Sequence, residues 1–346
     1  MKIVADENIP LLEPFFGKNH ELILKSGRAI SADDVKDADI LLVRSVTKVD
    51  EKLLAGSSVR FVGSTTTGFD HIDTPFLDAH HIQWAVAKGC NAQAVVEYVI
   101  CVIAALQNKN FLSGAHLKAA VIGVGEIGSQ VSQFLRKLGW QVLECDPFRA
   151  RDEKDFPGVT LDQIQDVDFI SIHTPLTRKG EYPTYHMIEK NFLQKQKKGA
   201  ILLNTARGSV IDFNDLKKHG THLHWCLDVW ENEPDIDLDV LKTAMIATPH
   251  IAGYSIESKY RGMEMIYHEM IDRKILSSTA NEVVIYPEHE LSENFSTDWR
   301  QNALAYFDPF QSTNEMKLAI FQQHQKFDIL RKSFSNRHEF LISLNL

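Results

Sequence analysis

Three polar residues, each close behind an apolar run, could together assist the oxidation of a secondary alcohol by a nicotinamide cofactor. Arg207 lies in NTARGSVID, Glu233 in LDVWENEP and His250 in ATPHIAGYS. The oxidation needs a base for the hydroxyl proton, and the unperturbed pKa of histidine suits that role. A carboxylate such as that of Glu233 would orient the imidazole and stabilise its charged form. Arg207 could bind a substrate carboxylate with two hydrogen bonds and polarise the neighbouring oxygen.

Each of the three residues also has an ordinary structural explanation. Arg207 could form a surface ion pair, Glu233 could be a solvated loop acid before a proline, and His250 could cap a helix. The interpretation as a catalytic site depends on all three residues lying at strand ends of one nucleotide-binding sheet.

A glycine motif predicts where the nucleotide would bind. Gly123, Gly125 and Gly128 form G-x-G-x-x-G between an apolar run at 119–122 and a segment with helical periodicity. The glycines would let the backbone approach a pyrophosphate, and the helix N-terminus would offer free N–H groups and a partial positive charge. A second predicted strand, 140–145, completes a βαβ unit.

Asp146 follows the second strand, 18 positions after Gly128. At about this spacing a carboxylate accepts hydrogen bonds from the adenosine ribose. A carboxylate would also repel a 2′-phosphate, which favours NAD over NADP, although Arg149 and Arg151 lie close by in sequence and weaken this argument.

Six apolar runs that end in polar residues predict one doubly wound parallel sheet around this motif. The runs lie at Ala119–Ile122, Trp140–Cys145, Asp168–His173, Gly199–Asn204, His224–Asp228 and Met245–His250. Their polar ends would face the same edge of the sheet as the pyrophosphate.

The first 92 residues show a second alternation of strands and helices, without a glycine motif. The predicted strands are 2–5, 40–43 and 60–63. Ser45 and Thr66 follow two of them, where a substrate could be held, although polar loops that cap the next helix explain them equally well.

The expected architecture is therefore α/β, with two doubly wound parallel-sheet domains, one of them a Rossmann NAD domain, and a small α+β C-terminal domain. Residues 1–92 with 257–281 would form a discontinuous substrate-binding domain, and 93–256 the NAD-binding domain. The aromatic segment 282–346 would serve dimerisation, and helical periodicity extends from Met316 to Leu330.

Composition limits the classes of function. The 346 residues are 44% hydrophobic and 24% charged, as in soluble globular proteins, and the net charge of −9 argues against nucleic acid and anionic lipid as partners.

The apolar run Val95–Leu106 is too short to span a bilayer and predicts a buried helix. No metal site is expected, since His222 and His224 lack acidic or cysteine partners. The scattered cysteines, Cys90, Cys101, Cys145 and Cys226, favour buried thiols in a reducing cytoplasm.

The motifs NTARGSVID, LDVWENEP and TPHIAG, with the glycine motif and Asp146, resemble those of the D-isomer-specific 2-hydroxyacid dehydrogenases, in the family order and from about residue 40 to 265. The resemblance implies Arg207 as carboxylate binder, Glu233 as partner of the histidine and His250 as proton acceptor. It also implies a set of residues around the cofactor NAD: Gly123, Gly125, Glu126, Ile127, Gly128, Asp146, Thr174, Ala206, Asp228 and Gly253.

The motifs MKIVADENIP, LLVRSVTKVD, GCNAQAVVEYV and HIAGYS resemble one branch of this family. That branch implies substrate contacts from Ser45, Thr66 and Tyr254, with Arg44 near a phosphate, and a homodimer. The expected reaction is oxidation at C2 of a small phosphorylated four-carbon 2-hydroxy acid by NAD, a step toward pyridoxal phosphate. The alternatives are another 2-hydroxy acid, such as 3-phosphoglycerate, or an NAD-sensing protein without catalysis.

Overall fold

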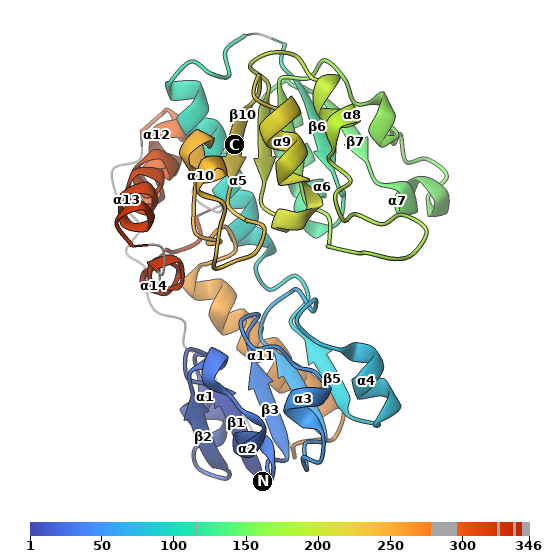
Figure 1. Cartoon of the computed structure of the whole chain (residues 1–346), viewed down its shortest axis with the longest axis vertical. Helices are drawn as coiled ribbons and strands as arrows, with labels where there is room; N and C mark the ends of the chain where they lie inside the picture. The colour runs from blue at the N-terminus through green and yellow to red at the C-terminus, as the bar shows by residue number, and fades with distance from the viewer. Residues whose placement is uncertain (115, 278–295, 324–325, 335–336, 341–346) are drawn as a thin grey trace. The chain divides into compact units, whose positions relative to one another are not determined.

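The computed structural model describes residues 1–114, 116–277, 296–323, 326–334 and 337–340. They form two compact units (Figure 1). One contains residues 1–91 and 255–277, and the other contains residues 92–254 and the described residues from 296 onward. Each unit is built on one parallel sheet with helices on both faces, so the predicted α/β class with two doubly wound sheets is confirmed.

The first unit has five parallel strands in the order β2-β1-β3-β4-β5. These are β1 (Lys2–Asp6), β2 (Glu21–Lys25), β3 (Ile40–Val43), β4 (Phe61–Ser64) and β5 (Gln83–Val86). Side chains alternate along each strand, so that Ile3 packs with α1 (Leu12–Phe16) and α11 (Ile256–Asp272), whereas Val4 faces the other core. The core around Val4 is covered by α2 (Ala32–Val35), α3 (Glu51–Leu54) and α4 (Thr74–Ala79). A short 3₁₀ turn, η1 (Gly27–Ala29), follows β2.

Helix α11 returns to the first sheet after the chain has built the second unit. Ser255 caps it, since the Ser255 hydroxyl accepts a hydrogen bond from the Ser258 N–H at 2.9 Å. Met263, Ile266 and Met270 then pack into the core of the first sheet. Gly262 lets the helix approach the end of β4, because a Cβ there would lie 2.3 Å from the Thr65 carbonyl oxygen.

The second unit has six parallel strands in the order β11-β10-β9-β8-β6-β7. All six predicted strands are confirmed, as β6 (Lys118–Ile122), β7 (Gln141–Cys145), β8 (Phe169–Ile172), β9 (Ile201–Asn204), β10 (His224–Leu227) and β11 (Ile246–Ala247). The order reverses at β6, so β6 and β8 frame the position where such sheets bind ligands.

Helices cover both faces of this second sheet, as Figure 1 shows. They are α5 (Ala92–Asn108), α6 (Glu126–Lys137), α7 (Pro147–Asp152), α8 (Lys190–Gln194), α9 (Phe213–His219) and α10 (Leu238–Thr243), with 3₁₀ turns η2 (Leu161–Gln163) and η3 (Gly208–Val210). Helix α5 is buried almost all round, as its apolar sequence predicts. In the part of the chain that the structure describes, no helix has both the length and the apolar character needed to cross a bilayer.

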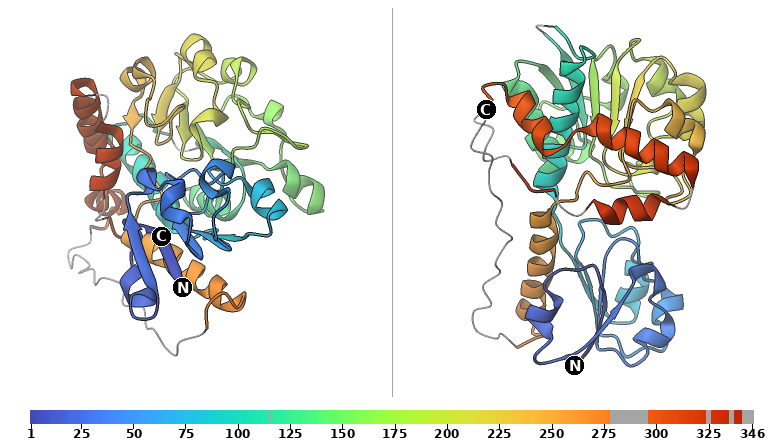
Figure 2. Two further views of the ribbon diagram at one scale, coloured as in Figure 1. Left: turned by 60° about the horizontal axis from the view of Figure 1, so that its bottom comes forward. Right: turned by 90° about the vertical axis from the view of Figure 1, so that its left-hand side faces the viewer.

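The described part of the C-terminal segment consists of helices that pack on the second unit. They are α12 (Trp299–Tyr306), α13 (Pro309–Gln322) and α14 (Phe327–Ser333), and Figure 2 shows α12 and α13 beside α5. Phe307 and Phe340 enter one core of this unit, and Met316 and Phe327 enter the other. This segment was expected to form a small α+β dimerisation domain. Its described residues share the cores of the second unit, and residues 282–295, 324–325, 335–336 and 341–346 lie outside the described set.

The helix expected from Met316 to Leu330 is interrupted. Helix α13 ends at Gln322, and Gln323 has the extended backbone angles φ −155° and ψ 108°. Helix α14 begins only at Phe327, so the apolar periodicity continues across two helices.

Candidate active site

His250 and Glu233, which are 17 residues apart, are in direct contact. The Nδ1 atom of His250 lies 2.7 Å from Oε2 of Glu233, and Oε1 of Glu233 accepts a hydrogen bond from the Trp230 N–H at 2.9 Å. The carboxylate therefore favours the tautomer with its proton on Nδ1, which leaves Nε2 to accept a proton. Burial raises the pKa of Glu233, but the charge and hydrogen bond of His250, the Arg331 charge and the Trp230 N–H outweigh it, so the pKa is lowered overall.

Asp228 fixes the turn that carries His250. Its carboxylate is fully buried and accepts hydrogen bonds from the Thr248 hydroxyl at 2.6 Å and from the N–H groups of Ile251 and Ala252 at 2.8 and 2.9 Å. The Asp228 carbonyl accepts the His250 N–H at 2.8 Å. Burial raises the pKa of Asp228, while the His250 charge and these hydrogen bonds oppose the shift. The residue predicted to contact the cofactor is thus also the support of the histidine.

Arg207 lies at the end of β9, next to the loop that leads to Glu233. The Asn204 side chain shapes this end, because its amide donates to the Arg207 carbonyl at 2.9 Å and its oxygen accepts the Ala206 N–H at 2.9 Å. Gly208 packs directly on the backbone of Trp230, where a Cβ would lie 2.0 Å from the carbonyl carbon. This backbone contact holds the loop that carries Arg207 against the loop that carries Glu233.

The three glycines of the motif have three different surroundings. Gly123 has φ +85°, and a Cβ on it would lie 2.8 Å from the His173 carbonyl group, while a Cβ on Gly128 would lie 2.0 Å from the Gly123 oxygen. Gly125, the N-cap of α6, has no atom within 4 Å of a Cβ position. Gly123 thus forms the turn, Gly128 permits close packing of the helix, and Gly125 leaves open the approach that a pyrophosphate requires.

Asp146 lies against this turn. Its two oxygens accept the Val124 N–H at 2.9 Å and the Arg149 N–H at 3.1 Å. Arg149 is held by Glu153, with contacts of 2.7 and 2.6 Å, and Arg151 by Asp152 and Glu181. Because carboxylates compensate both arginines, neither offers an unopposed charge to a 2′-phosphate.

The other predicted cofactor residues surround the same edge of the sheet. Glu126 and Ile127 are the first residues of α6, Ala206 follows β9, and Gly253 follows the His250 turn. The Thr174 hydroxyl is buried and has no hydrogen-bond partner among the described residues, and its methyl group lies beside Gly123. A buried hydroxyl without a partner fits a site that a polar ligand completes.

Of the predicted substrate residues, Ser45 and Thr66 belong to the first unit and Tyr254 to the second. The Thr66 hydroxyl lies 3.0 Å from that of Ser64, which in turn lies 3.3 Å from Nε2 of His71. His71 therefore has a structural partner, as the sequence suggested.

Arg44, before Ser45, is held in place by a buried acid. Its Nε and Nη2 donate to the two oxygens of Asp6 at 2.8 and 3.3 Å, and Asp6 is fully buried. Lys259, in the first turn of α11, is close enough for its pKa to be lowered by burial and by the Arg44 charge. The sequence analysis missed Lys259, and the only signal was its position five residues after Tyr254.

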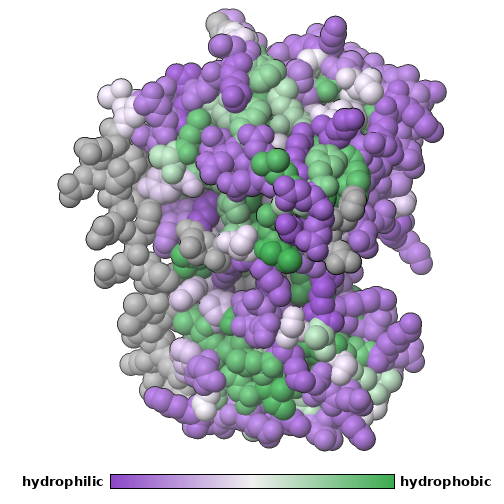
Figure 3. Space-filling model, turned by 60° about the vertical axis from the view of Figure 1, so that its left-hand side comes forward, coloured by the Kyte–Doolittle hydropathy of each residue, from purple (hydrophilic) through white to green (hydrophobic). Residues whose placement is uncertain are grey.

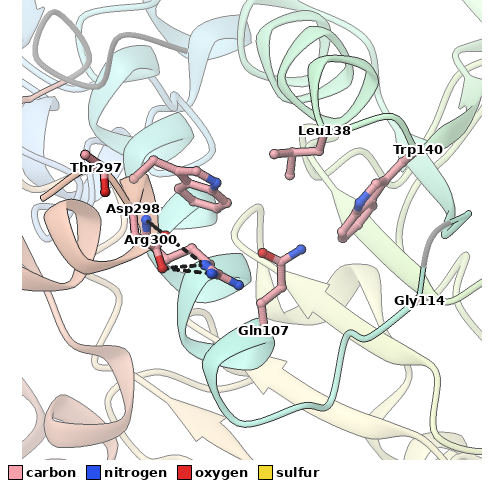
Figure 4. A pocket seen from close by; sticks show the side chains of 8 residues that line it. Gln107, Gly114, Leu138, Trp140, Thr297, Asp298 and Arg300 are labelled. Atoms are coloured by element: carbon pink, nitrogen blue, oxygen red, sulfur yellow. Dashed lines mark hydrogen bonds and ion pairs between the residues drawn. The ribbon is translucent and has the colours of Figure 1, made fainter.

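An open pocket of about 490 Å³ lies between the ends of α5 and α6 and the start of α12 (Figure 4), and its lining includes Trp140, Trp299 and Arg300 but none of the predicted site residues. Asp298 binds the Arg300 guanidinium at 2.7 Å. Within the described ranges, no group of three metal-ligating side chains is found.

Comparisons with known proteins agree with this geometry. Residues 104–252 match the model of the D-isomer specific 2-hydroxyacid dehydrogenase NAD binding domain. The chain is 44% identical over 343 residues to an erythronate-4-phosphate dehydrogenase of Coxiella burnetii, covering 98% of this chain and 93% of the relative. It is 41% identical over 357 residues to one of Pseudomonas entomophila, covering 98% and 92%.

Solved structures give the same fold. A D-lactate dehydrogenase of Aquifex aeolicus with NAD and lactic acid has a TM-score of 0.65 at 25% identity, over 79% of this chain and 96% of that one. A 3-phosphoglycerate dehydrogenase of Entamoeba histolytica with NAD⁺ has a TM-score of 0.67 at 23% identity, over 82% and 99%. The chain belongs to the erythronate-4-phosphate dehydrogenases, a branch of the D-isomer-specific 2-hydroxyacid dehydrogenases that act on a CH–OH group with NAD.

Proposed function

We propose that this protein oxidises 4-phospho-D-erythronate at C2 to (R)-3-hydroxy-2-oxo-4-phosphooxybutanoate, with reduction of NAD, as a step in pyridoxal 5′-phosphate biosynthesis. The observation that carries the proposal is the His250–Glu233 pair at 2.7 Å, at the same carboxyl edge of the parallel sheet as the glycine turn, in a chain whose relatives of this name match along 98% of its length.

In this proposal His250, Glu233 and Arg207 are the catalytic residues. Nε2 of His250 accepts the C2 hydroxyl proton, and Glu233 stabilises the imidazolium that results. Arg207 holds the substrate carboxylate and polarises the C2 oxygen. NAD, when bound, accepts the hydride that leaves C2, so the products are the 2-oxo acid, NADH and one proton.

We propose that the second unit, approximately residues 93–256, holds NAD through the ten residues predicted above. The pyrophosphate would lie over Gly125 and the N–H groups of Glu126 and Ile127, and the ribose hydroxyls would reach Asp146. The Thr174 hydroxyl would gain the partner that it lacks among the described residues. The Asp146 carboxylate and the compensated Arg149 support NAD over NADP.

The first unit would bind the substrate, and its charges suit a phosphate. Asp6 holds Arg44 at a fixed position and neutralises its charge. Because Lys259 adds a second positive charge, these three residues together leave a net positive charge near Ser45. Ser45 and Thr66 would add hydroxyl donors, and Tyr254 a phenol.

The test is a direct assay. Purified protein is mixed with NAD and 4-phosphoerythronate, and the absorbance of reduced nicotinamide is followed. We expect kcat/KM to exceed that for 3-phosphoglycerate and for unphosphorylated erythronate. Equal or higher values for either of those acids would assign a different specificity, and absence of NADH with all three would favour an NAD-sensing role without catalysis.

We also propose that the protein is a cytoplasmic homodimer. Apolar side chains remain exposed on α13 and α14, with exposed fractions of 66% for Leu318, 47% for Phe321 and 63% for Ile329. Figure 3, with the side of the molecule that bears α13 turned forward, shows apolar groups among the polar ones. Light scattering should report a dimer for wild type and a monomer for Leu318→Lys/Phe321→Lys; a monomeric wild type would contradict the proposal.

The cytoplasmic location is supported by the four buried cysteine thiols, which suit a reducing compartment, and cell fractionation would test it.

A further inference from the structure

Two buried arginines from the C-terminal segment reach the loop that follows His250. Arg331 on α14 is 7% exposed and Arg337 is 6% exposed. A cation is buried at this level only when charges or hydrogen bonds compensate it. Phe327, before Arg331, and Phe340, after Arg337, are almost fully buried and anchor the chain on either side of the two arginines.

Arg337 fixes the backbone of that loop. Its Nε donates to the Tyr254 carbonyl at 2.9 Å, and its Nη2 donates to the carbonyls of Ala252 and Ala94 at 2.6 and 3.0 Å. One guanidinium thereby ties the loop to the start of α5. The Phe340 N–H also donates to Oε1 of Glu97 on α5, at 2.8 Å.

Arg331 faces the side chains of the site. The carbon of its guanidinium lies 5.3 Å from the centre of the Tyr254 ring, a cation–π arrangement. The charged groups that act on it are the carboxylates of Glu233, Asp228 and Asp328. Of these, Glu233 contacts His250, and Asp228 supports the His250 turn.

The charges of this region explain what Arg331 contributes. The carboxylates of Glu233, which is part-buried, and of Asp228, which is fully buried, both act on His250. The buried guanidinium of Arg331 acts on both Glu233 and Asp228 and offsets one of their two negative charges. The flat face of the Tyr254 ring fixes the position of this guanidinium.

We propose that Arg331 is a positioning residue and specificity determinant for the oxidation: it holds the Tyr254 phenol toward the substrate and balances the Glu233 and Asp228 carboxylates around His250. This inference rests on the proposed function. It gives the C-terminal segment a role in the reaction itself, in addition to the proposed role in dimerisation.

The test compares Arg331→Met, which removes the charge at similar length, with Arg331→Lys, which keeps it. For Arg331→Met we expect the acidic limb of the kcat/KM profile to move to higher pH by about one unit and the KM for 4-phosphoerythronate to rise about tenfold. The KM for NAD should not change. Arg331→Lys should restore the acidic limb but not the KM. Lys332→Met, an exposed change on the same helix, should behave as wild type.

An unchanged pH profile and substrate KM in Arg331→Met would overturn the inference. If that variant does not fold, Arg331→Lys decides, because wild-type KM and kcat in that variant would show that the planar contact with Tyr254 is not needed. A readout without turnover separates this test from the proposed function. In protein with labelled tyrosines, the Tyr254 ring signals should shift in Arg331→Met but not in Lys332→Met, and unchanged Tyr254 signals in Arg331→Met would overturn the inference.

Discussion

The two units use the same kind of sheet, but acids predominate at the carboxyl edge of the second sheet and cations at that of the first. In the second unit the strand ends bring the acids Asp146, Asp228 and Glu233, each of which accepts backbone N–H groups. In the first unit the corresponding loops bring Arg44, and α11 adds Lys259, with Asp6 as the acid that fixes Arg44. Parallel sheets gather polar groups at one edge whatever their sequence, and the charge of those groups then selects the ligand.

We propose that this difference gives the two units separate tasks. Carboxylates suit hydroxyl groups and an imidazole, as in a nucleotide ribose and a catalytic base, whereas cations suit a phosphate. Variants in each unit should therefore have separable effects.

The largest effect is expected in the second unit, at the base. His250→Ala should lower kcat about 10²- to 10⁴-fold, because no other group would accept the hydroxyl proton, while the affinity for NADH stays the same. Steady-state kinetics and fluorescence titration with NADH measure the two quantities. Unchanged kcat would remove His250 from the mechanism.

The first unit should show its role through substrate discrimination. Lys259→Met should lower kcat/KM for 4-phosphoerythronate about 10- to 100-fold, the value of one or two charge-assisted hydrogen bonds, and affect unphosphorylated erythronate much less. Lys52→Met, an exposed lysine of the same unit, is the matched control. Equal losses for both acids would mean that Lys259 does not recognise the phosphate.

A smaller effect is expected at the cofactor acid. Asp146→Asn keeps an oxygen to cap α7 but loses the charge, so the dissociation constant of NAD should rise about tenfold while that of NADP changes less. Isothermal titration with both nucleotides measures the ratio. Parallel changes for NAD and NADP would argue against a contact with the ribose.

The smallest effect concerns stability. Removal of the His173 ring from water lowers its pKa to about 3 from 6.5, so between these pH values the unfolded chain binds more protons than the folded one. This contribution to stability is complete above pH 6.5 and is lost as the pH falls toward 3. Between pH 6.5 and 5.5 the free energy of unfolding should drop by about 1 kcal/mol. His173→Gln should lack that part of the slope in urea titrations, and an equal slope in both proteins would refute the assignment.

How far the sequence predicts this molecule depends on burial. The six strands of the second sheet are apolar runs, and each was recognised. Strands β2 and β5 were missed because they form the edges of the first sheet, where half-exposed side chains interrupt the apolar pattern. The family resemblance implied the pairing of His250 with Glu233, and their strand-end positions only allowed it. The full burial of Asp228 was not predicted, because burial is set by the tertiary packing.

The C-terminal contribution to the site had no signal in the sequence. Arg331 and Arg337 occur in a tail without a motif, and a charged residue there would ordinarily be solvated. Only their packing against Tyr254 and Ala252 shows that they reach the site. The helix break after Gln322 was likewise invisible, since the apolar spacing continues beyond it.

The packing of Gly208 on Trp230 has a consequence for how this enzyme could be redesigned. Since even a methyl group at position 208 would collide with the Trp230 carbonyl group, the separation of the two loops is set by the backbone. Libraries that aim at new hydroxy acids should therefore randomise the side chains that surround the substrate and leave position 208 untouched. A change there would disturb guanidinium and carboxylate together, and no compensating side chain could restore both.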